Sequence, residues 1–212
     1  MLKVNEIFFS IQGESSFAGI PFVLVRLTGC NLRCSYCDTK YAYEEGENLS
    51  VKQILKEIKK FECKYVEITG GEPLLQDETP FLVDFLIDKG FKVLVETNGT
   101  KDVSVLSEKA IIVMDIKCPS SGESDKTDWD NLKRLGLKDE VKFVLTEKSD
   151  YDWAKKVIKE KKLTGKFTIL LSPVSEKIDP ATLAEKILED NLNVRLQLQL
   201  HKILWPGVER GR

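Results

Sequence analysis

Residues 28–39 read Thr-Gly-Cys-Asn-Leu-Arg-Cys-Ser-Tyr-Cys-Asp-Thr and place Cys30, Cys34 and Cys37 in the spacing C-x3-C-x2-C. Thiolates bind soft metal centres, so three of them on one glycine-preceded loop suit an iron–sulfur cluster or zinc. Three protein ligands, instead of four, leave one metal position open. The loop therefore predicts a metal centre that can also bind a small molecule.

A closed zinc site is the alternative reading of this loop. Cys63, Cys118 or His201 would then have to supply the fourth ligand. Structural zinc sites usually combine two short ligand pairs, whereas this chain offers one triplet. Under this alternative the protein would be a zinc-stabilised binding module without catalysis.

The composition is that of an ordinary globular chain. Of its 212 residues, 42% are apolar and 31% are charged, and the formal net charge is -2. These values predict one α/β domain over residues 1–212 and argue against long disorder. Because the net charge gives no general attraction to nucleic acid, no direct nucleic-acid partner is expected.

The sequence contains no membrane or export signal. No apolar run approaches the roughly 20 residues that span a bilayer, and the first residues lack the apolar stretch of a signal peptide. The five cysteines are an odd number with three of them clustered, which fits metal binding in a reducing compartment better than disulfides. We therefore expect a cytoplasmic protein that does not associate with membranes.

Segments with strand periodicity alternate with segments of helical periodicity along the chain. Residues 41–48 are expected to form a loop and residues 205–212 a loosely held tail, while Ser50 and Asp179 are expected to cap helices. We expect strands at residues 4–12, 22–27, 65–69, 92–96, 111–116, 140–145, 167–171 and 194–200, and helices at 51–60, 79–90, 129–135, 149–161 and 180–190.

Strands that alternate with amphipathic helices form right-handed βαβ units and a parallel sheet. The many strands and the fewer, shorter helices predict an incomplete, TIM-like barrel. In such folds the loops that leave the carboxyl ends of the strands build the active site. We therefore expect the cysteine loop to meet residues 70–73, 97–99, 117–121 and 171–174 in one cleft.

Two motifs together resemble the radical S-adenosylmethionine (SAM) superfamily. They are the cysteine triplet and Gly70-Gly71-Glu72-Pro73, which follows a strand, with Thr97-Asn98-Gly99 as a weaker companion. The resemblance implies a 4Fe-4S cluster on the three cysteines, SAM on its open iron, and a one-electron donor protein. It also implies that Glu72 supplies charge to the amino group of SAM.

Further stretches resemble the 7-carboxy-7-deazaguanine synthase family. They are residues 9–14, Arg26, Cys37-Asp38-Thr39 and His201-Lys202. This resemblance covers essentially the whole chain. It implies conversion of 6-carboxy-5,6,7,8-tetrahydropterin to 7-carboxy-7-deazaguanine and ammonia, for queuosine, archaeosine or another deazapurine, by a homodimer that uses Mg²⁺.

The resemblance assigns roles residue by residue. It places Ile11, Gln12, Gly13, Glu14, Arg26, Thr69 and His201 at the pterin and Thr39 at Mg²⁺. It places Tyr36, Cys37, Asp38, Gly70, Gly71, Glu72, Asn98, Lys117, Cys118, Pro119, Ser120, Leu171, Ser172, Pro173 and Val174 at SAM.

The residue types suit these roles. Gln12 and Glu14 can match the donors and acceptors of a pterin edge, and Arg26 can bind a carboxylate with two hydrogen bonds. A threonine hydroxyl suits Mg²⁺, which prefers oxygen ligands. An activase that generates a glycyl radical on a partner protein is the alternative within the superfamily, but it would leave these residues without a role.

The chain departs from the family pattern in two places. Ser15 stands where the family usually has a glycine, so the turn beside the pterin is expected to differ. The chain also continues to Arg212, beyond the point where some relatives end, which puts any role of the terminal carboxylate in doubt.

Overall fold

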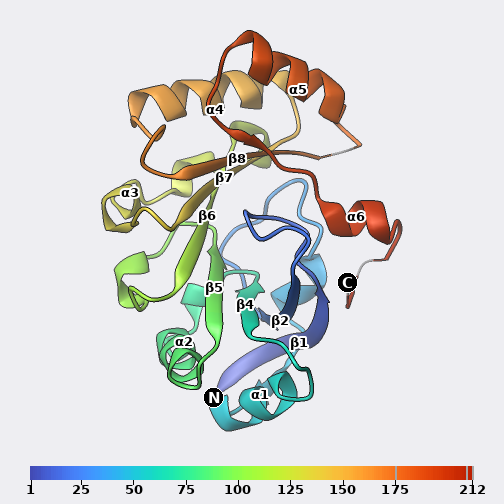
Figure 1. The fold of residues 1–212 in the computed structure, drawn as a ribbon, viewed down its shortest axis with the longest axis vertical. Coiled ribbons are helices and arrows are strands. Elements are labelled where there is room, and N and C mark those ends of the chain that lie inside the picture. The colour runs from blue at the N-terminus through green and yellow to red at the C-terminus, as the bar shows by residue number, and fades with distance from the viewer. Residues whose placement is uncertain (175, 209, 212) are drawn as a thin grey trace.

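The computed structural model describes residues 1–174, 176–208 and 210–211. A single nine-stranded sheet with the order β3-β1-β2-β4-β5-β6-β7-β8-β9 runs through the chain. From β2 to β9 all neighbouring strands are parallel, and β1 is antiparallel to both β2 and β3. Among the described residues β3 and β9 are edge strands and do not pair with each other, so the expected incomplete barrel is confirmed (Figure 1).

From β4 onwards an α-helix separates each pair of successive strands except β5 and β6, which are joined through a short 3₁₀ turn at Val103–Val105. The bounds of the strands and helices are β1 Leu2–Ile11, β2 Pro21–Leu27, β3 Glu47–Leu49, α1 Val51–Ile58, β4 Tyr65–Gly70, α2 Thr79–Asp88, β5 Lys92–Thr97, β6 Ile111–Lys117, α3 Asn131–Arg134, β7 Glu140–Leu145, α4 Lys148–Glu160, β8 Thr168–Pro173, α5 Pro180–Glu189, β9 Arg195–Leu196 and α6 Leu200–Leu204.

Side chains at two helix starts bind free backbone amides, as predicted. The hydroxyl of Ser50 accepts the amide of Gln53, whose side chain in turn accepts the amide of Ser50. At α5, which begins with Pro180, Asp179 accepts the amide of Thr182 at 3.1 Å. Such caps stabilise a helix by about 1 kcal/mol each and fix where it begins.

The two faces of the sheet differ in character. Val66, Ile68 and Phe143 belong to the large apolar core, which the helices cover from outside. On the opposite face Phe22, Leu94, Val113 and Leu170 form a smaller apolar cluster with Phe17 of the β1–β2 loop. Because strand side chains alternate between faces, the residues that share this inner face point into the barrel.

The predicted strand at residues 194–200 is wrong. Only Arg195–Leu196 pair with β8, and the chain then forms α6. The alternation of this segment does not reflect a half-buried strand, since Gln197 is buried while Leu196 is 37% exposed. The amide of Leu200 donates instead to the carbonyl of Gly13 at 3.0 Å, which draws the chain away from the sheet.

One further prediction for an irregular segment needs correction. Within residues 41–48, Lys40–Tyr43 form a 3₁₀ turn and Glu47–Leu49 form β3, because the segment pairs with β1. In the tail, Arg210 pairs with Glu45 at 3.0 Å and lies 4.1 Å from the ring centroid of Tyr41. Because this ion pair is exposed and such pairs stabilise little, the loosely held tail stays a prediction.

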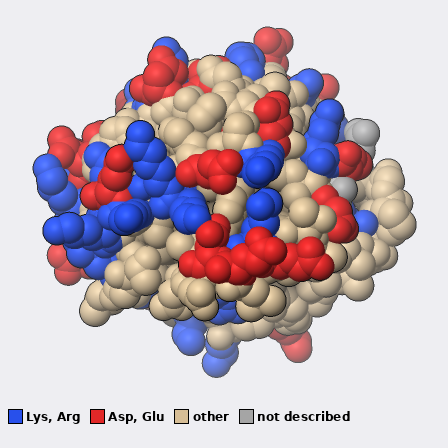
Figure 2. All heavy atoms as spheres, turned by 90° about the horizontal axis from the view of Figure 1, so that it is seen from above, with Lys and Arg blue, Asp and Glu red and all other residues tan. Residues whose placement is uncertain are grey.

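None of the described helices is long and apolar enough to cross a bilayer. Figure 2 shows the end of the molecule that carries α4 and α5. Lysine and arginine side chains gather on one side of this face, and a band of acidic side chains lies beside them. The face therefore presents both signs of charge instead of one continuous basic surface.

Candidate active site

The cysteine loop leaves the carboxyl end of β2 and enters one large cavity. Cys30, Cys34 and Cys37 all line this cavity, and all three are free thiols. Burial raises the pKa of Cys34 to about 11, so the thiol needs a metal centre to hold it as a thiolate. The three thiols thus face one space from one short loop.

The segment after β4 fits tightly against this loop. A β-carbon on Gly71 would lie 2.1 Å from the carbonyl oxygen of Gly29 and 2.7 Å from the β-carbon of Cys30. The amide of Glu72 donates to the same carbonyl at 2.7 Å. Only glycine permits this approach, which places Gly70 and Gly71 beside the thiols.

Glu72 does not present its charge to the cavity. Its carboxylate accepts the amides of Leu74 and Asn98 and the hydroxyl of Thr97 at 2.6–2.9 Å, and the side chain is fully buried. The expected direct contact with the amino group of SAM is therefore not what the geometry favours. Glu72 instead ties the turn after β4 to the end of β5.

The three thiols fit an iron–sulfur cluster better than a single ion. Among the described residues, no three His, Cys, Asp or Glu side chains converge closely enough to hold one metal ion. A four-iron cluster instead bonds each thiolate to a different iron, which requires separated sulfurs. Cys63, which donates to the carbonyl of Pro21, and the fully buried Cys118 do not line the cavity, so neither can complete a zinc site. His201, the third candidate, lines the cavity and packs against Gly13.

All seven residues predicted to contact the pterin line this same cavity, as does Thr39. Gly13 allows the closest approach among them, because a β-carbon there would lie 2.2 Å from Nδ1 of His201. The side-chain amide of Gln12 is held at both ends. Its oxygen accepts the backbone amide of Glu14, and its nitrogen donates to the carboxylate of Glu67. Gly13 near the N-terminus and His201 near the C-terminus therefore lie in the same wall of the cavity.

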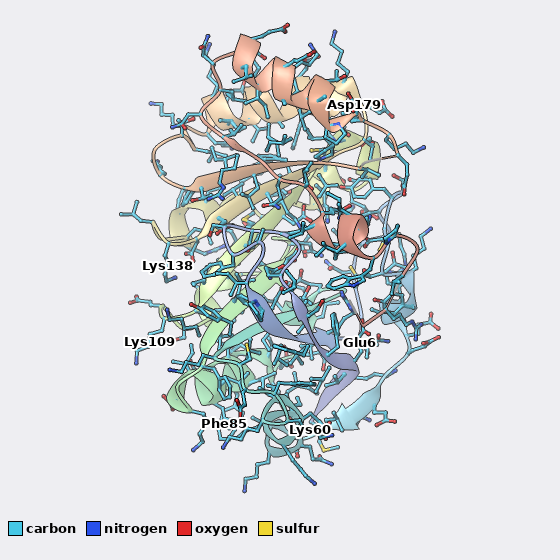
Figure 3. The ribbon with its side chains drawn as sticks, turned by 45° about the vertical axis from the view of Figure 1, so that its right-hand side comes forward. Glu6, Lys60, Phe85, Lys109, Lys138 and Asp179 are labelled. Carbon is cyan, nitrogen blue, oxygen red and sulfur yellow. The ribbon has the colours of Figure 1, made fainter. Side chains whose placement is uncertain are left out.

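Arg26 is held in the cavity wall by a partner on the neighbouring strand. Its Nε donates to Glu6 of β1 at 2.8 Å, and its guanidinium lies 5.9 Å from the ring centroids of both Phe8 and Tyr41. Glu6 lies on the side of the molecule that also carries α6 (Figure 3). These contacts fix a cation on the wall formed by β2.

The sequence analysis missed four ionisable residues inside the barrel. Glu67, Glu96, Asp115 and Lys142 come from the successive strands β4 to β7, and all four line the cavity. Each stands between apolar or β-branched neighbours in its strand, as in Val66-Glu67-Ile68. A charged residue at the inward position of a buried parallel strand was the signal that could have revealed them.

Lys142 lies at the centre of these charges. Its ammonium is 2.6 Å from Glu14 and 3.4 Å from Asp115, and it also donates to Glu96. Burial alone would raise the pKa of Glu14, but Lys142 outweighs burial and lowers it to about 2. Burial raises the pKa of Glu67 to about 8, assisted by Glu96, with which it shares a hydrogen bond. Lys142 and Glu14 are therefore charged at neutral pH, and Glu67 is largely protonated.

The residues predicted to contact SAM divide into two groups. Tyr36, Cys37, Asp38, Gly70, Gly71, Asn98, Lys117 and Val174 line the cavity. Glu72, Cys118, Pro119, Ser120, Leu171, Ser172 and Pro173 do not line it.

The 118–121 turn is held against α4 instead of the cavity. Asp150 accepts the amides of Ser120 and Thr146 and also binds the hydroxyl of Ser120. Cys118 is fully buried and packs in the large apolar core, and so does Leu171 of β8. This turn therefore packs against α4, on the side of the cavity wall that faces away from the cavity.

Polar atoms without partners indicate that the cavity is built for a ligand. Among the described residues, Tyr36, Asp115 and Gln199 line it, and the buried Oη of Tyr36, Oδ1 of Asp115 and Oε1 of Gln199 have no hydrogen-bond partner. An unsatisfied buried polar group costs about 1–3 kcal/mol. A bound polar molecule would remove this cost.

Comparison with known proteins agrees with this geometry. The Radical SAM superfamily model matches residues 24–116. The chain is 44% identical over 214 residues to a 7-carboxy-7-deazaguanine synthase of Chlorobaculum tepidum, with 99% of this chain and 97% of the relative covered. It is 39% identical over 226 residues to a 7-carboxy-7-deazaguanine synthase of Koribacter versatilis, with 99% and 100% covered.

The fold is similar to that of a solved relative as well. The crystal structure of QueE from Escherichia coli matches with a TM-score of 0.79 and 26% identity over 94% of each chain. Full-length similarity, the cysteine loop and the incomplete barrel lead to the same assignment. The chain belongs to the 7-carboxy-7-deazaguanine synthase family of the radical SAM superfamily.

Proposed function

We propose that this protein is a radical SAM lyase that converts 6-carboxy-5,6,7,8-tetrahydropterin to 7-carboxy-7-deazaguanine and ammonia. One observation carries the proposal: the cysteine triplet and all seven expected pterin contacts line one cavity. The family relatives support it, because similarity extends over nearly the whole chain. They also favour this activity over a glycyl-radical activase or a zinc-binding module.

The chain would hold its two cofactors at the end of the barrel where the carboxyl ends of the parallel strands lie. Cys30, Cys34 and Cys37 would bind the 4Fe-4S cluster, and the lining residues around Gly71 and Asn98 would hold SAM. When bound, these cofactors supply the electron and the 5′-deoxyadenosyl radical that abstracts hydrogen from the substrate. The wall excludes water and keeps the substrate in one orientation.

The pterin would lie deeper in the barrel, beside the β1–β2 loop and the His201 that packs against it. Arg26 would bind the substrate carboxylate, and Gln12 and Glu14 would match the polar edge of the ring. Thr39 would supply an oxygen ligand to Mg²⁺ beside the substrate carboxylate. Its hydroxyl lies 3.7 Å from the sulfur of Cys37, so the Mg²⁺ site would adjoin the cluster.

The test is anaerobic incubation of reconstituted protein with SAM, a reductant, Mg²⁺ and the carboxylated tetrahydropterin. We expect 5′-deoxyadenosine and a deazaguanine chromophore to form together. Formation of 5′-deoxyadenosine alone would keep the superfamily chemistry and reject the substrate. Omission of Mg²⁺ tests the metal separately, and we expect a slower reaction without it.

Cys34→Ala provides the matched variant. It removes one of the three cluster ligands, so we expect iron content and turnover to be lost together. Cys63→Ala is the control, because Cys63 lies outside the cavity. A Cys34→Ala protein that keeps a full four-iron spectrum would reject the assignment of the ligands.

Other expectations accompany this proposal and stay predictions. They are a single domain, a homodimer, a separate one-electron donor protein and a cytoplasmic location. Sedimentation of the purified protein would test the homodimer, and reconstitution of turnover with candidate electron carriers would test the donor.

A further inference from the structure

Lys142 is an unusual residue for the interior of a barrel. It lies on β7, its side chain is only 4% exposed, and the strand around it is otherwise apolar apart from Glu140 at its start. Burying an ammonium costs several kcal/mol unless partners compensate it. The position therefore needs an explanation beyond packing.

Carboxylates from three other segments surround this ammonium. Glu14 comes from the β1–β2 loop, Glu96 from β5 and Asp115 from β6. Without Lys142, Glu14 and Glu96 would lose their ion pairs inside the barrel, where like charges repel strongly, whereas Asp115 would keep Lys117 at 2.9 Å. The ammonium thus allows Glu14 and Glu96 to share one region of the cavity wall.

Other side chains besides Lys142 also hold the carboxylates of Glu14 and Glu96 in place. Gln199 donates to Oε1 of Glu14 at 2.8 Å, while Lys142 binds Oε2 of the same group. Glu67, which shares a hydrogen bond with Glu96, is itself bound by Gln12. Glu14 and Glu96 therefore line the cavity as two fixed acceptors, with Lys142 bound to both.

We propose that Lys142 is a positioning residue that holds Glu14 and Glu96 as a pair of acceptors for the amino-pyrimidine edge of the pterin. The inference rests on the proposed function, because it concerns how the same pocket selects its substrate. A 2-aminopyrimidine edge carries adjacent N–H donors, which a pair of carboxylates can accept. An analogue with a 2-oxo group keeps the N3–H donor but replaces the amino donor with an acceptor, which leaves one carboxylate of the pair unsatisfied.

The experiment measures binding of two stable probes, pterin-6-carboxylate and lumazine-6-carboxylate, which carry 2-amino and 2-oxo groups respectively. Calorimetric titrations use anaerobically reconstituted protein with SAM, Mg²⁺ and no low-potential reductant, so that nothing turns over. We expect the wild type to prefer the pterin by roughly a hundredfold. In Lys142→Met we expect pterin affinity to fall about tenfold or more and the preference to shrink to within about tenfold.

Lys133→Met is the control, because this lysine side chain is 81% exposed and remote from the cavity lining. We expect it to keep both affinities. If Lys142→Met does not fold, the double variant Lys142→Met/Asp115→Asn takes its place in the test, because it removes one charge of each sign and leaves both acceptors intact. We expect this variant also to lose the preference.

The outcomes distinguish a failure of the role of Lys142 from a failure of the proposed function. Retention of the preference in folded Lys142→Met or in the double variant would overturn the role of Lys142. A parallel loss of affinity for both probes would also overturn it, since a purely structural defect does not distinguish an amino from an oxo group. A wild type that binds neither probe would instead contradict the proposed pterin function.

Discussion

At the scale of single residues, two glycines are as important to the site as its charged residues. Gly71 lets the turn after β4 touch the backbone of the cysteine loop, and Gly13 leaves room for the imidazole of His201. Ser15 adopts a φ of 63°, so the serine takes the left-handed backbone that the family glycine would adopt more easily. The expected difference from the family at this turn stays a prediction.

Gly71→Ala should disturb the cluster loop directly. The new β-carbon would overlap the carbonyl of Gly29, which is rigid backbone. We expect reconstituted iron content to fall to less than about half, with a loss of stability of about 1–3 kcal/mol from overpacking. Iron analysis and urea unfolding measure both quantities.

Gly136→Ala is the control for that substitution, because its nearest neighbour would lie at an ordinary 3.7 Å. Equal iron content in the two variants would show that the close approach at Gly71 does not position the loop.

Glu67 should make stability depend on pH. Its pKa is about 8 in the folded protein, so between about pH 5 and pH 8 the folded state keeps a proton that the unfolded chain has released. Stability must therefore fall as pH rises through this window. Glu67→Gln keeps a neutral side chain beside Gln12, Glu96 and Arg26 and removes this titration.

We expect the free energy of unfolding of Glu67→Gln, relative to the wild type, to rise by at least about 1 kcal/mol from about pH 5.5 to pH 8. Urea titrations at the two pH values measure this difference. A constant difference between the two proteins would mean that Glu67 titrates normally.

At the scale of elements, the segment from β9 through α6 closes the open side of the barrel. Leu200 donates to Gly13, Gln199 to Glu14, and Lys202 lies 3.2 Å from Asp38 of the cysteine loop. Figure 1 shows α6 beside β1 and β2, away from the helices that cover the outer face. The C-terminal segment thus joins the two ends of an unclosed sheet.

Leu200→Pro should loosen this closure without breaking α6. Proline is tolerated at the first position of a helix but cannot donate the hydrogen bond to Gly13. We expect hydrogen exchange in α6 to accelerate by about tenfold, which corresponds to about 1 kcal/mol, while β4 to β7 stay protected. Unchanged exchange in α6 would show that other contacts hold the segment.

At the scale of the whole molecule, the core and the cofactor loop are largely independent. The large apolar cluster lies between the sheet and its helices, whereas the cysteine loop contributes only Leu32 and Cys34 to the buried apolar residues. We therefore expect the scaffold to fold without the cluster. Figure 3 shows the helices that cover the sheet on its outer side.

Removal of the cluster should accordingly leave the fold intact. We expect iron chelation under anaerobic, reducing conditions to preserve the far-ultraviolet circular dichroism spectrum. The thermal midpoint should fall by several degrees, because a ligand that binds only the folded state stabilises it. Loss of the spectrum at about 25 °C would mean that the cluster is required for folding.

The sequence alone determined the features that depend on neighbouring residues. The cysteine spacing, the caps at Ser50 and Asp179, and the strands from β4 to β8 follow from local chemistry and periodicity. The resemblance then predicted seven pterin contacts that share one cavity. These features could be predicted because the required residues stand close together or repeat with a fixed period.

Only the tertiary structure decided which distant charges meet. Lys142 is separated from Glu14 by 128 residues, and neither strand periodicity nor motif spacing specifies that pair. The alternation at residues 194–200 predicted a strand, but hydrogen bonding to Gly13 turned the chain into α6. Likewise the carboxylate of Glu72 turned away from the cavity, because the amide of Leu74 in its own turn and the amide of Asn98 after β5 bind it. Partners contributed by remote strands determine these outcomes, and they come together only when the sheet curls.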